Sequence, residues 1–188
     1  SKFINMILQL KKIAEKIEDL KKFNKYDVLD LHSPYFTSSE INSLNSCIKS
    51  TFVSTKGNFI KMLEQKVKKI TGSKYVILTN SGSSAAFLAL RVLKIESNTE
   101  VFIPSLNYIS NANALCTLNL IPHFVESEKD SFGIDMNLLE KYFNNNFSKR
   151  KNSYYNKKTG NKISGLICTH IFGNTSNIDI VKKFCKKN

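Results

Sequence analysis

A glycine followed by two serines, Gly82, Ser83 and Ser84, is the part of the sequence with the clearest chemical potential. An apolar stretch precedes this turn, and a helical pattern over 83–93 follows it. The first N–H groups of a helix lack an intrahelical acceptor and carry the positive end of the helix dipole, so the turn can bind a phosphate. The serine hydroxyl groups can add donors. Taken by itself, the pattern fits a serine-capped helix without a ligand somewhat better.

Two more side chains, Tyr108 and His170, are expected at one edge of a sheet. Tyr108 follows an extended segment that ends at Pro104, and His170 lies near the end of another, 164–171. The carboxyl ends of parallel strands share the edge at which ligands bind. Tyr108 can stack on a flat heteroaromatic ring whose phosphate lies at Ser83. Taken singly, Tyr108 fits ordinary loop packing and His170 fits a histidine of the core. The occurrence of the serine turn, Tyr108 and His170 at one edge favours a ligand-binding site.

Alternating extended and helical patterns must position these side chains. Extended segments are expected at 75–79, 100–104, 122–126 and 164–171, and helices at 59–70, 83–93, 110–119, 136–147 and 179–185. Several of the extended segments are apolar on both faces, which is typical of parallel strands covered by helices. The sequence therefore predicts an α/β fold with a mostly parallel sheet and helices on both faces.

Before this region, the sequence predicts a helical N-terminal arm. Apolar residues at three- and four-residue steps indicate an amphipathic helix over 3–21, and Val28–Leu31 reads as a short extended segment. Thr37-Ser-Ser-Glu40 has the pattern of a helix start, so a second helix is expected up to about residue 50. We expect two parts: an arm over 1–50 and a domain over 51–188.

The stretch 148–162 breaks the alternation of strands and helices. It is polar and basic and contains Thr159–Gly160, a turn signal. We expect an exposed excursion from the domain, with a hairpin or loop at that turn.

The formal net charge of +13 raises the question of a nucleic-acid partner. Arginine is the side chain best suited to recognise phosphate and guanine, but it occurs only at Arg91 and Arg150. Lysine is scattered over every segment. A lysine-rich composition explains this better than a nucleic-acid interface does, and a positive field can also attract a polyanionic small substrate. We expect no nucleic-acid partner.

Other classes of site and location are also constrained by the sequence. The three histidines are far apart and the four cysteines show no Cys-x-x-Cys spacing, so no metal site is expected. No apolar run approaches the roughly 20 residues of a membrane helix, and the first 22 residues lack the features of a signal peptide. We expect a cytoplasmic protein without a membrane partner.

Four linked stretches of the chain identify a resemblance to a known family. They are Phe52-Val-Ser-Thr-Lys-Gly57, Asn80-Ser-Gly-Ser-Ser-Ala-Ala86, Pro104-Ser-Leu-Asn-Tyr-Ile-Ser-Asn-Ala-Asn-Ala114 and His170-Ile-Phe-Gly173. In this order they resemble the DegT/DnrJ/EryC1/StrS family of pyridoxal-phosphate (PLP) sugar aminotransferases, which have the aspartate-aminotransferase fold (PLP fold type I). The insert Tyr155-Asn-Lys-Lys-Thr-Gly-Asn-Lys-Ile-Ser164 looks like the subgroup that makes amino sugars for legionaminic acid and bacillosamine pathways.

The resemblance implies roles for the residues already singled out. Gly82, Ser83 and Ser84 would hold the phosphate of PLP, and Tyr108 would stack on its pyridine ring. His170 would have a supporting role near the cofactor. Two further residues, Ser54 and Thr55, match a region that lines the site near the dimer interface and are weaker substrate-side candidates. The family usually forms homodimers.

The chain also departs from the family pattern. In the family, the acidic partner of the pyridine nitrogen and the Schiff-base lysine follow the region that this sequence covers, and no lysine here matches that lysine's motif. PLP chemistry needs both groups. We therefore expect the N-terminal part of a PLP-binding domain, incomplete at its C-terminus, that binds PLP and contains no catalytic residue of its own.

The resemblance favours one activity for the complete protein and leaves alternatives open. That activity is transfer of an amino group from an amino acid, with glutamate the expected donor, to a 4-keto-6-deoxy nucleotide sugar. A sugar dehydratase of the same family is a close alternative, because that branch binds the cofactor with a histidine in place of the lysine. A basic binding module and a non-catalytic remnant are the alternatives outside catalysis.

Overall fold

The structure is a computed structural model that describes residues 2–24 and 34–188. The chain divides into two compact units, Ser1–Lys66 and Val67–Asn188. The division expected from the sequence, between residues 50 and 51, remains a prediction. The expected extended segment Val28–Leu31 lies outside the described residues.

The first unit is helical. It contains α1 (Lys2–Asn24) and α2 (Ser38–Lys49), and α3 (Asn58–Thr71) crosses into the second unit. The Thr37 side chain accepts from the backbone of α2, and the Glu40 carboxylate accepts from the Thr37 N–H at 2.6 Å, which is the capping box that the sequence indicates. The Thr37 hydroxyl, followed by this N–H, holds the pKa of Glu40 below its usual value.

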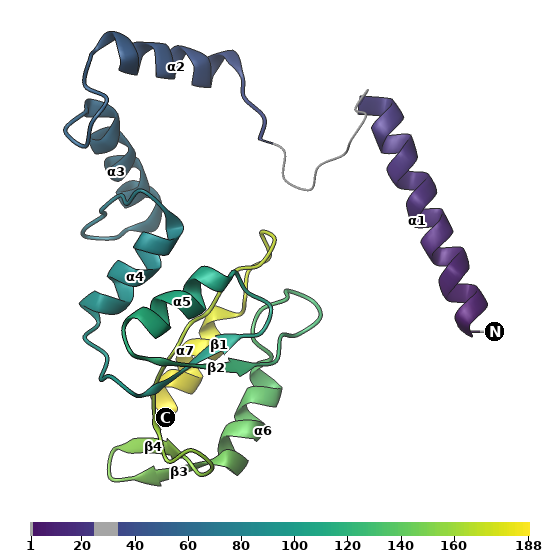
Figure 1. The fold of residues 1–188 in the computed structure, drawn as a ribbon, viewed down its shortest axis with the longest axis vertical. Helices are drawn as coiled ribbons and strands as arrows, with labels where there is room; N and C mark the ends of the chain where they lie inside the picture. Colours follow the sequence, from purple (N-terminus) through teal and green to yellow (C-terminus); the bar gives the residue numbers. More distant parts are fainter. Residues whose placement is uncertain (1, 25–33) are drawn as a thin grey trace. The chain divides into compact units, whose positions relative to one another are not determined.

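The second unit is built on a five-stranded sheet with the order β2-β1-β5-β4-β3 (Figure 1). Its strands are β1 (Glu100–Pro104), β2 (Ile121–Val125), β3 (Phe147–Arg150), β4 (Ser153–Asn156) and β5 (Lys162–Leu166). Strands β2, β1 and β5 are parallel, while β4 is antiparallel to both β5 and β3. All five residues of β1 are buried, as expected for a strand covered on both faces.

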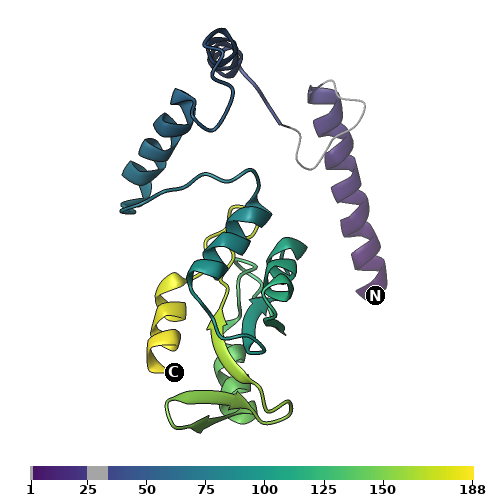
Figure 2. The same cartoon turned by 60° about the vertical axis from the view of Figure 1, so that its left-hand side comes forward.

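Helices cover both faces of this sheet and create two hydrophobic cores. The helices are α4 (Gly82–Val92), α5 (Ile109–Thr117), α6 (Met136–Asn146) and α7 (Ile178–Lys187). Figure 2 shows helices on both sides of the sheet. Val101 and Ile103 of β1 pack with α4 and α5, while the intervening Phe102 packs on the other face with α6 and α7. This alternation follows from the two-residue repeat of a strand. The parallel β-α alternation predicted from the sequence is thus confirmed.

One predicted strand is wrong in this structure. Residues 75–79 form no strand, and the side chains of Tyr75 and Ile77 are exposed. A strand is defined by its hydrogen bonds to a neighbour, and no neighbouring strand pairs with this segment among the described residues. An apolar pattern alone does not specify a strand, because the partner strand is not local.

The polar, basic stretch 148–162, which includes most of the insert, is also less exposed than the sequence suggests. It folds as β3 and β4, joined by a turn at Lys151–Asn152, and returns to β5 through a second turn in which Gly160 has a φ of +78°. Asn156 in β4 is buried. The hairpin expected at Thr159–Gly160 is therefore present, but it extends the sheet and forms part of its interior.

A buried carboxylate, Glu100, ties the insert to β1. It accepts hydrogen bonds from Asn156 Nδ2 at 3.0 Å and Thr159 Oγ1 at 2.5 Å, and His123 Nδ1 lies 2.7 Å away. Burial acts to raise the pKa of Glu100, but these hydrogen bonds outweigh it and hold the pKa below its ordinary value. The carboxylate is thus ionised and fixes the insert at the amino ends of the parallel strands.

Gly133→Ala is expected to destabilise the second unit by about 1–3 kcal/mol, because no space exists for a β-carbon. An added Cβ would lie 2.2 Å from Ser176 Oγ and 2.9 Å from Ser176 Cβ. Thermal or urea unfolding of the variant measures the loss. The double variant Gly133→Ala/Ser176→Gly removes the clashing side chain and should recover part of the loss, and no recovery would contradict this explanation.

Candidate functional site

The turn before α4 is organised by Ser81. Its hydroxyl oxygen accepts from the backbone N–H of Ser84 at 3.1 Å, and its backbone carbonyl accepts from Thr79 Oγ1 at 2.8 Å. Ser81 therefore caps the helix, a role that the sequence analysis did not assign to it. Because one first-turn donor is satisfied in this way, the N–H groups of Gly82 and Ser83 are left as donors for an anion.

The two serines predicted to contact a phosphate lie on the first turn of α4. The Ser84 hydroxyl oxygen lies 3.1 Å from the Ser81 hydroxyl, which donates to it. Ser84 can then turn its own hydrogen outward. Ser83 is exposed, and its hydroxyl has no partner in the part of the chain that the structure describes. Both hydroxyl groups are thus positioned to donate at the positive end of the helix dipole.

A cavity of about 510 Å³ brings these serines together with Tyr108. Tyr108 is the N-cap residue of α5, and its side chain is 76% exposed. Serine donors and an aromatic ring therefore border the same space, although the segment before the serines forms no strand in the described part of the chain. The described residues that line this cavity include no carboxylate and no amine. A phosphate with an attached aromatic ring fits this chemistry, because it meets donors and an apolar face without charge repulsion.

The cavity also has a polar wall on α5 that the sequence analysis missed. Ser110, Asn113 and Thr117 line it. Their spacing of three and four residues places them on one face of a helix whose other face, with Ala112 and Leu115, is buried. The three- and four-residue spacing of polar side chains directly after Tyr108 is the sequence signal that could have indicated this wall. These side chains can bind hydroxyl or carbonyl groups of a ligand.

Three further predicted site residues, His170, Ser54 and Thr55, are not among the residues that line this cavity. The His170 Nδ1 accepts from the backbone N–H of Ser176 at 3.1 Å. The weaker candidates, Ser54 and Thr55, belong to the first unit. The structure therefore brings together Ser83, Ser84 and Tyr108, and the binding roles of all the predicted site residues stay predictions.

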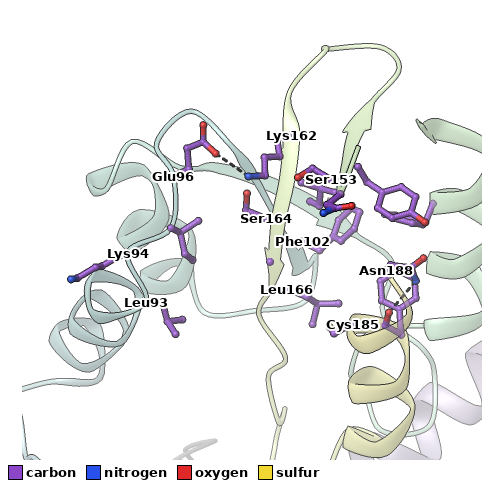
Figure 3. A pocket seen from close by; sticks show the side chains of 17 residues that line it. Leu93, Lys94, Glu96, Phe102, Ser153, Lys162, Ser164, Leu166, Cys185 and Asn188 are labelled. Atoms are coloured by element: carbon purple, nitrogen blue, oxygen red, sulfur yellow. Dashed lines mark hydrogen bonds and ion pairs between the residues drawn. The ribbon is translucent and has the colours of Figure 1, made fainter. Parts of the chain in front are cut away.

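A second cavity, of about 550 Å³, lies beside β5 and differs in character (Figure 3). Its floor includes Phe102 and Leu166, and the Lys162–Glu96 ion pair of 2.9 Å lies at its rim. β5 pairs with β1 along one edge, but on its other edge β4 pairs only with Lys162 and Ile163, so residues 164–166 have no strand partner there in the described part of the chain. The buried Ser164 Oγ has no hydrogen bond among the described residues. These are features of an unpaired strand edge and do not assemble a catalytic constellation.

Among residues 2–24 and 34–188, no group of three or more His, Cys, Asp or Glu side chains is placed to hold a metal ion. None of the helices in those ranges combines the length and apolar character needed to cross a bilayer.

The family assignment rests on a match over most of the chain. The model of the DegT/DnrJ/EryC1/StrS aminotransferase family matches residues 34–188, which include the serine turn, Tyr108 and His170. The chain belongs to this family. GDP-perosamine synthase of Escherichia coli O157:H7 is 27% identical over 158 residues, which are 84% of this chain and 39% of that protein. GDP-perosamine synthase of Vibrio cholerae is 26% identical over 161 residues, or 86% of this chain and 40% of that protein.

Solved structures of family members show the same fold. An Escherichia coli GDP-4-keto-6-deoxy-D-mannose-3-dehydratase with bound hydrated PLP has a TM-score of 0.68 at 20% identity, covering 85% of this chain and 38% of that one. A family aminotransferase from Brucella abortus has a TM-score of 0.65 at 19% identity, covering 80% and 39%. The predicted aminotransferase-type fold is therefore confirmed. The chain spans about two fifths of the length of the relatives it matches.

Proposed function

We propose that this chain is the cofactor-binding part of a PLP-dependent aminotransferase that acts on a nucleotide sugar. The observation that carries this proposal is the shared cavity of Ser83, Ser84 and Tyr108 in a chain of this family. In the complete protein, an amino group would pass from an amino acid, with glutamate the expected donor, to a 4-keto-6-deoxy nucleotide sugar.

The residues of this chain bind and orient the cofactor in this proposal. The Gly82 and Ser83 N–H groups and the two serine hydroxyls would hold the phosphate, while Tyr108 would lie against the ring. When bound, PLP would supply the electron sink for the chemistry at the amino carbon. The cavity itself lacks an amine or carboxylate among its described lining residues, so proton transfer would depend on groups elsewhere.

Two finer assignments belong to the same proposal. The insert that folds as the β4–β5 hairpin supports membership of the subgroup that serves legionaminic acid and bacillosamine pathways. We also propose a cytoplasmic homodimer, with Ser54 and Thr55 on the substrate side and His170 in a supporting role near the cofactor. The net charge of +13 would help to attract a nucleotide sugar, whose phosphates are negative.

A sugar dehydratase is the second candidate function. The dehydratase neighbour, with bound hydrated PLP, has a TM-score of 0.68 with this chain, so the fold serves both reactions. The two activities are distinguished by the product of the complete protein. Amino transfer incorporates ¹⁵N from labelled glutamate into the sugar, whereas dehydration gives a deoxy-sugar without label.

Cofactor binding by the 188-residue chain is tested with pyridoxamine 5′-phosphate, which has no aldehyde to react with surface lysines. Its fluorescence should change on binding, and Tyr108→Ala should weaken binding about three- to tenfold because a ring–ring contact is lost. Tyr108→Phe retains the ring and should bind like the original chain. Binding that is insensitive to Tyr108→Ala would contradict the proposed orientation of the ring.

A further inference from the structure

Asn107, the residue before Tyr108, is the meeting point of three hydrogen-bond donors. Its Oδ1 accepts from the backbone N–H of Tyr108 at 2.8 Å, from Asn111 Nδ2 at 3.0 Å and from Thr169 Oγ1 at 3.4 Å. Tyr108 has no side-chain cap of its own. The start of α5, where Tyr108 lies, is therefore held by the side chain of the preceding residue.

This contact also links Tyr108 to the loop that carries His170. Thr169 follows β5, its carbonyl accepts from Ser176 Oγ at 2.8 Å, and the Ser176 N–H donates to His170 Nδ1. Asn107 therefore connects the ends of β1 and β5, two segments that lie 62 residues apart in the sequence. His170 does not line the cavity with Tyr108, but Asn107 Oδ1 accepts hydrogen bonds from both the Tyr108 N–H and the hydroxyl of Thr169, the residue before His170.

The other end of the Asn107 amide is anomalous. Its Nδ2 is buried and has no hydrogen-bond partner among the described residues. A buried donor without an acceptor is costly, and an aspartate would accept the same three donors without leaving an N–H unpaired. The hydrogen bonds within this chain therefore favour aspartate at position 107, and the asparagine requires another explanation.

That explanation is the charge of the neighbouring site. Asn107 does not line the cavity, but Tyr108, the next residue, does, and the described lining carries no charge. An aspartate at position 107 would place a negative charge one residue from that lining, where it would repel an anion at the serine turn. Asparagine offers the same accepting oxygen without the charge, and the unpaired Nδ2 is then a tolerated consequence.

We propose that Asn107 is a positioning residue that fixes Tyr108 through Oδ1 and keeps the surroundings of the anion site uncharged. The role in neutrality rests on the proposed function, because it requires that an anion binds at the serine turn. The positioning role rests only on the hydrogen bonds that Asn107 Oδ1 accepts. Three variants separate these parts. Asn107→Asp keeps the acceptor and adds a charge, and Asn107→Ala removes the acceptor. Asn144→Asp adds the same charge at an exposed position of α6.

The first measurement is amide hydrogen exchange of the ligand-free chain. Tyr108 N–H exchange should stay protected in Asn107→Asp and become at least about tenfold faster in Asn107→Ala, because only the latter loses the acceptor. Equal protection of Tyr108 in the alanine variant would overturn the positioning role. The melting temperature of each variant verifies that the second unit remains folded.

The second measurement is the affinity for pyridoxamine 5′-phosphate at fixed salt. Asn107→Asp should weaken it about tenfold or more, while Asn144→Asp should leave it within twofold. Equal affinity of Asn107→Asp and the original chain would overturn the role of neutrality. If the original chain does not bind this probe while the exchange results hold, the proposed function and the neutrality role fail, and the positioning role stands.

Discussion

Glu100→Gln is expected to lower the free energy of unfolding of the second unit by about 2–4 kcal/mol. The carboxylate is 1% exposed and is surrounded by donors: Asn156 and Thr159 donate to it, and His123 Nδ1 lies 2.7 Å away. A glutamine of the same size would direct an NH₂ group toward at least one of these donors. It would also remove the charge that strengthens the remaining hydrogen bonds. Urea unfolding followed by circular dichroism measures the difference.

Glu96→Gln is the matched control for this effect. Glu96 pairs with Lys162 of β5 at 2.9 Å, but its side chain is 67% exposed. An exposed ion pair contributes only about 0–1 kcal/mol, so this variant should be nearly as stable as the original chain. Similar losses in both variants would show that burial and the converging donors at Glu100 do not matter, contrary to the expectation.

The pH dependence of stability gives the same hypothesis a second test. Because the pKa of Glu100 is lower in the folded state than in the unfolded chain, its contribution is complete above the unfolded pKa of about 4.3. It is lost as the pH falls through the lower, folded pKa. Glu100→Gln should therefore flatten the fall in stability on acidification. The pKa values of Glu40 and Glu128 are also lowered, so a smaller acid dependence should remain.

Local patterns predicted most of the second unit, and long-range pairing explains the exceptions. The apolar run of β1 and the helical repeats around it were sufficient for the parallel β-α order. Segment 75–79 has the same local pattern, but its strand partner is not specified locally. Glu100 was recognised only as the first residue of a strand, because its donors Asn156 and Thr159 lie 56 and 59 residues away.

The local patterns placed the serine turn before α4 and Tyr108 after β1, and they missed the contacts between distant segments. The strand-end argument holds for Tyr108 but not for Ser83, because residues 75–79 form no strand in the described part of the chain. The capping by Ser81 and the donors that meet at Asn107 depend on side-chain orientation, which residue types alone do not determine. The His170 Nδ1 accepts from the backbone N–H of Ser176 in its own loop, a contact that residue types do not reveal, and its role near the cofactor stays a prediction.

Ser83→Ala combined with Ser84→Ala is expected to weaken binding of pyridoxamine 5′-phosphate about a hundredfold or more. Each lost hydroxyl removes a hydrogen bond to a charged group, worth about 1.5–3 kcal/mol, so the two together contribute about 3 kcal/mol or more. Both hydroxyls lie in the cavity with Tyr108, so the loss should be visible in the same fluorescence titration. Ser97→Ala, at an exposed serine outside the cavity, should bind normally.

Comparison with unphosphorylated pyridoxamine decides whether the serines act on the phosphate. The original chain should prefer the phosphorylated compound, and the double variant should lose most of that preference while its affinity for pyridoxamine stays unchanged. Because the chain carries a net charge of +13, both titrations need the same salt concentration and an inorganic phosphate control. If the double variant keeps the full preference for the phosphorylated compound, the phosphate binds elsewhere, since a general attraction to positive charge does not depend on two neutral hydroxyl groups.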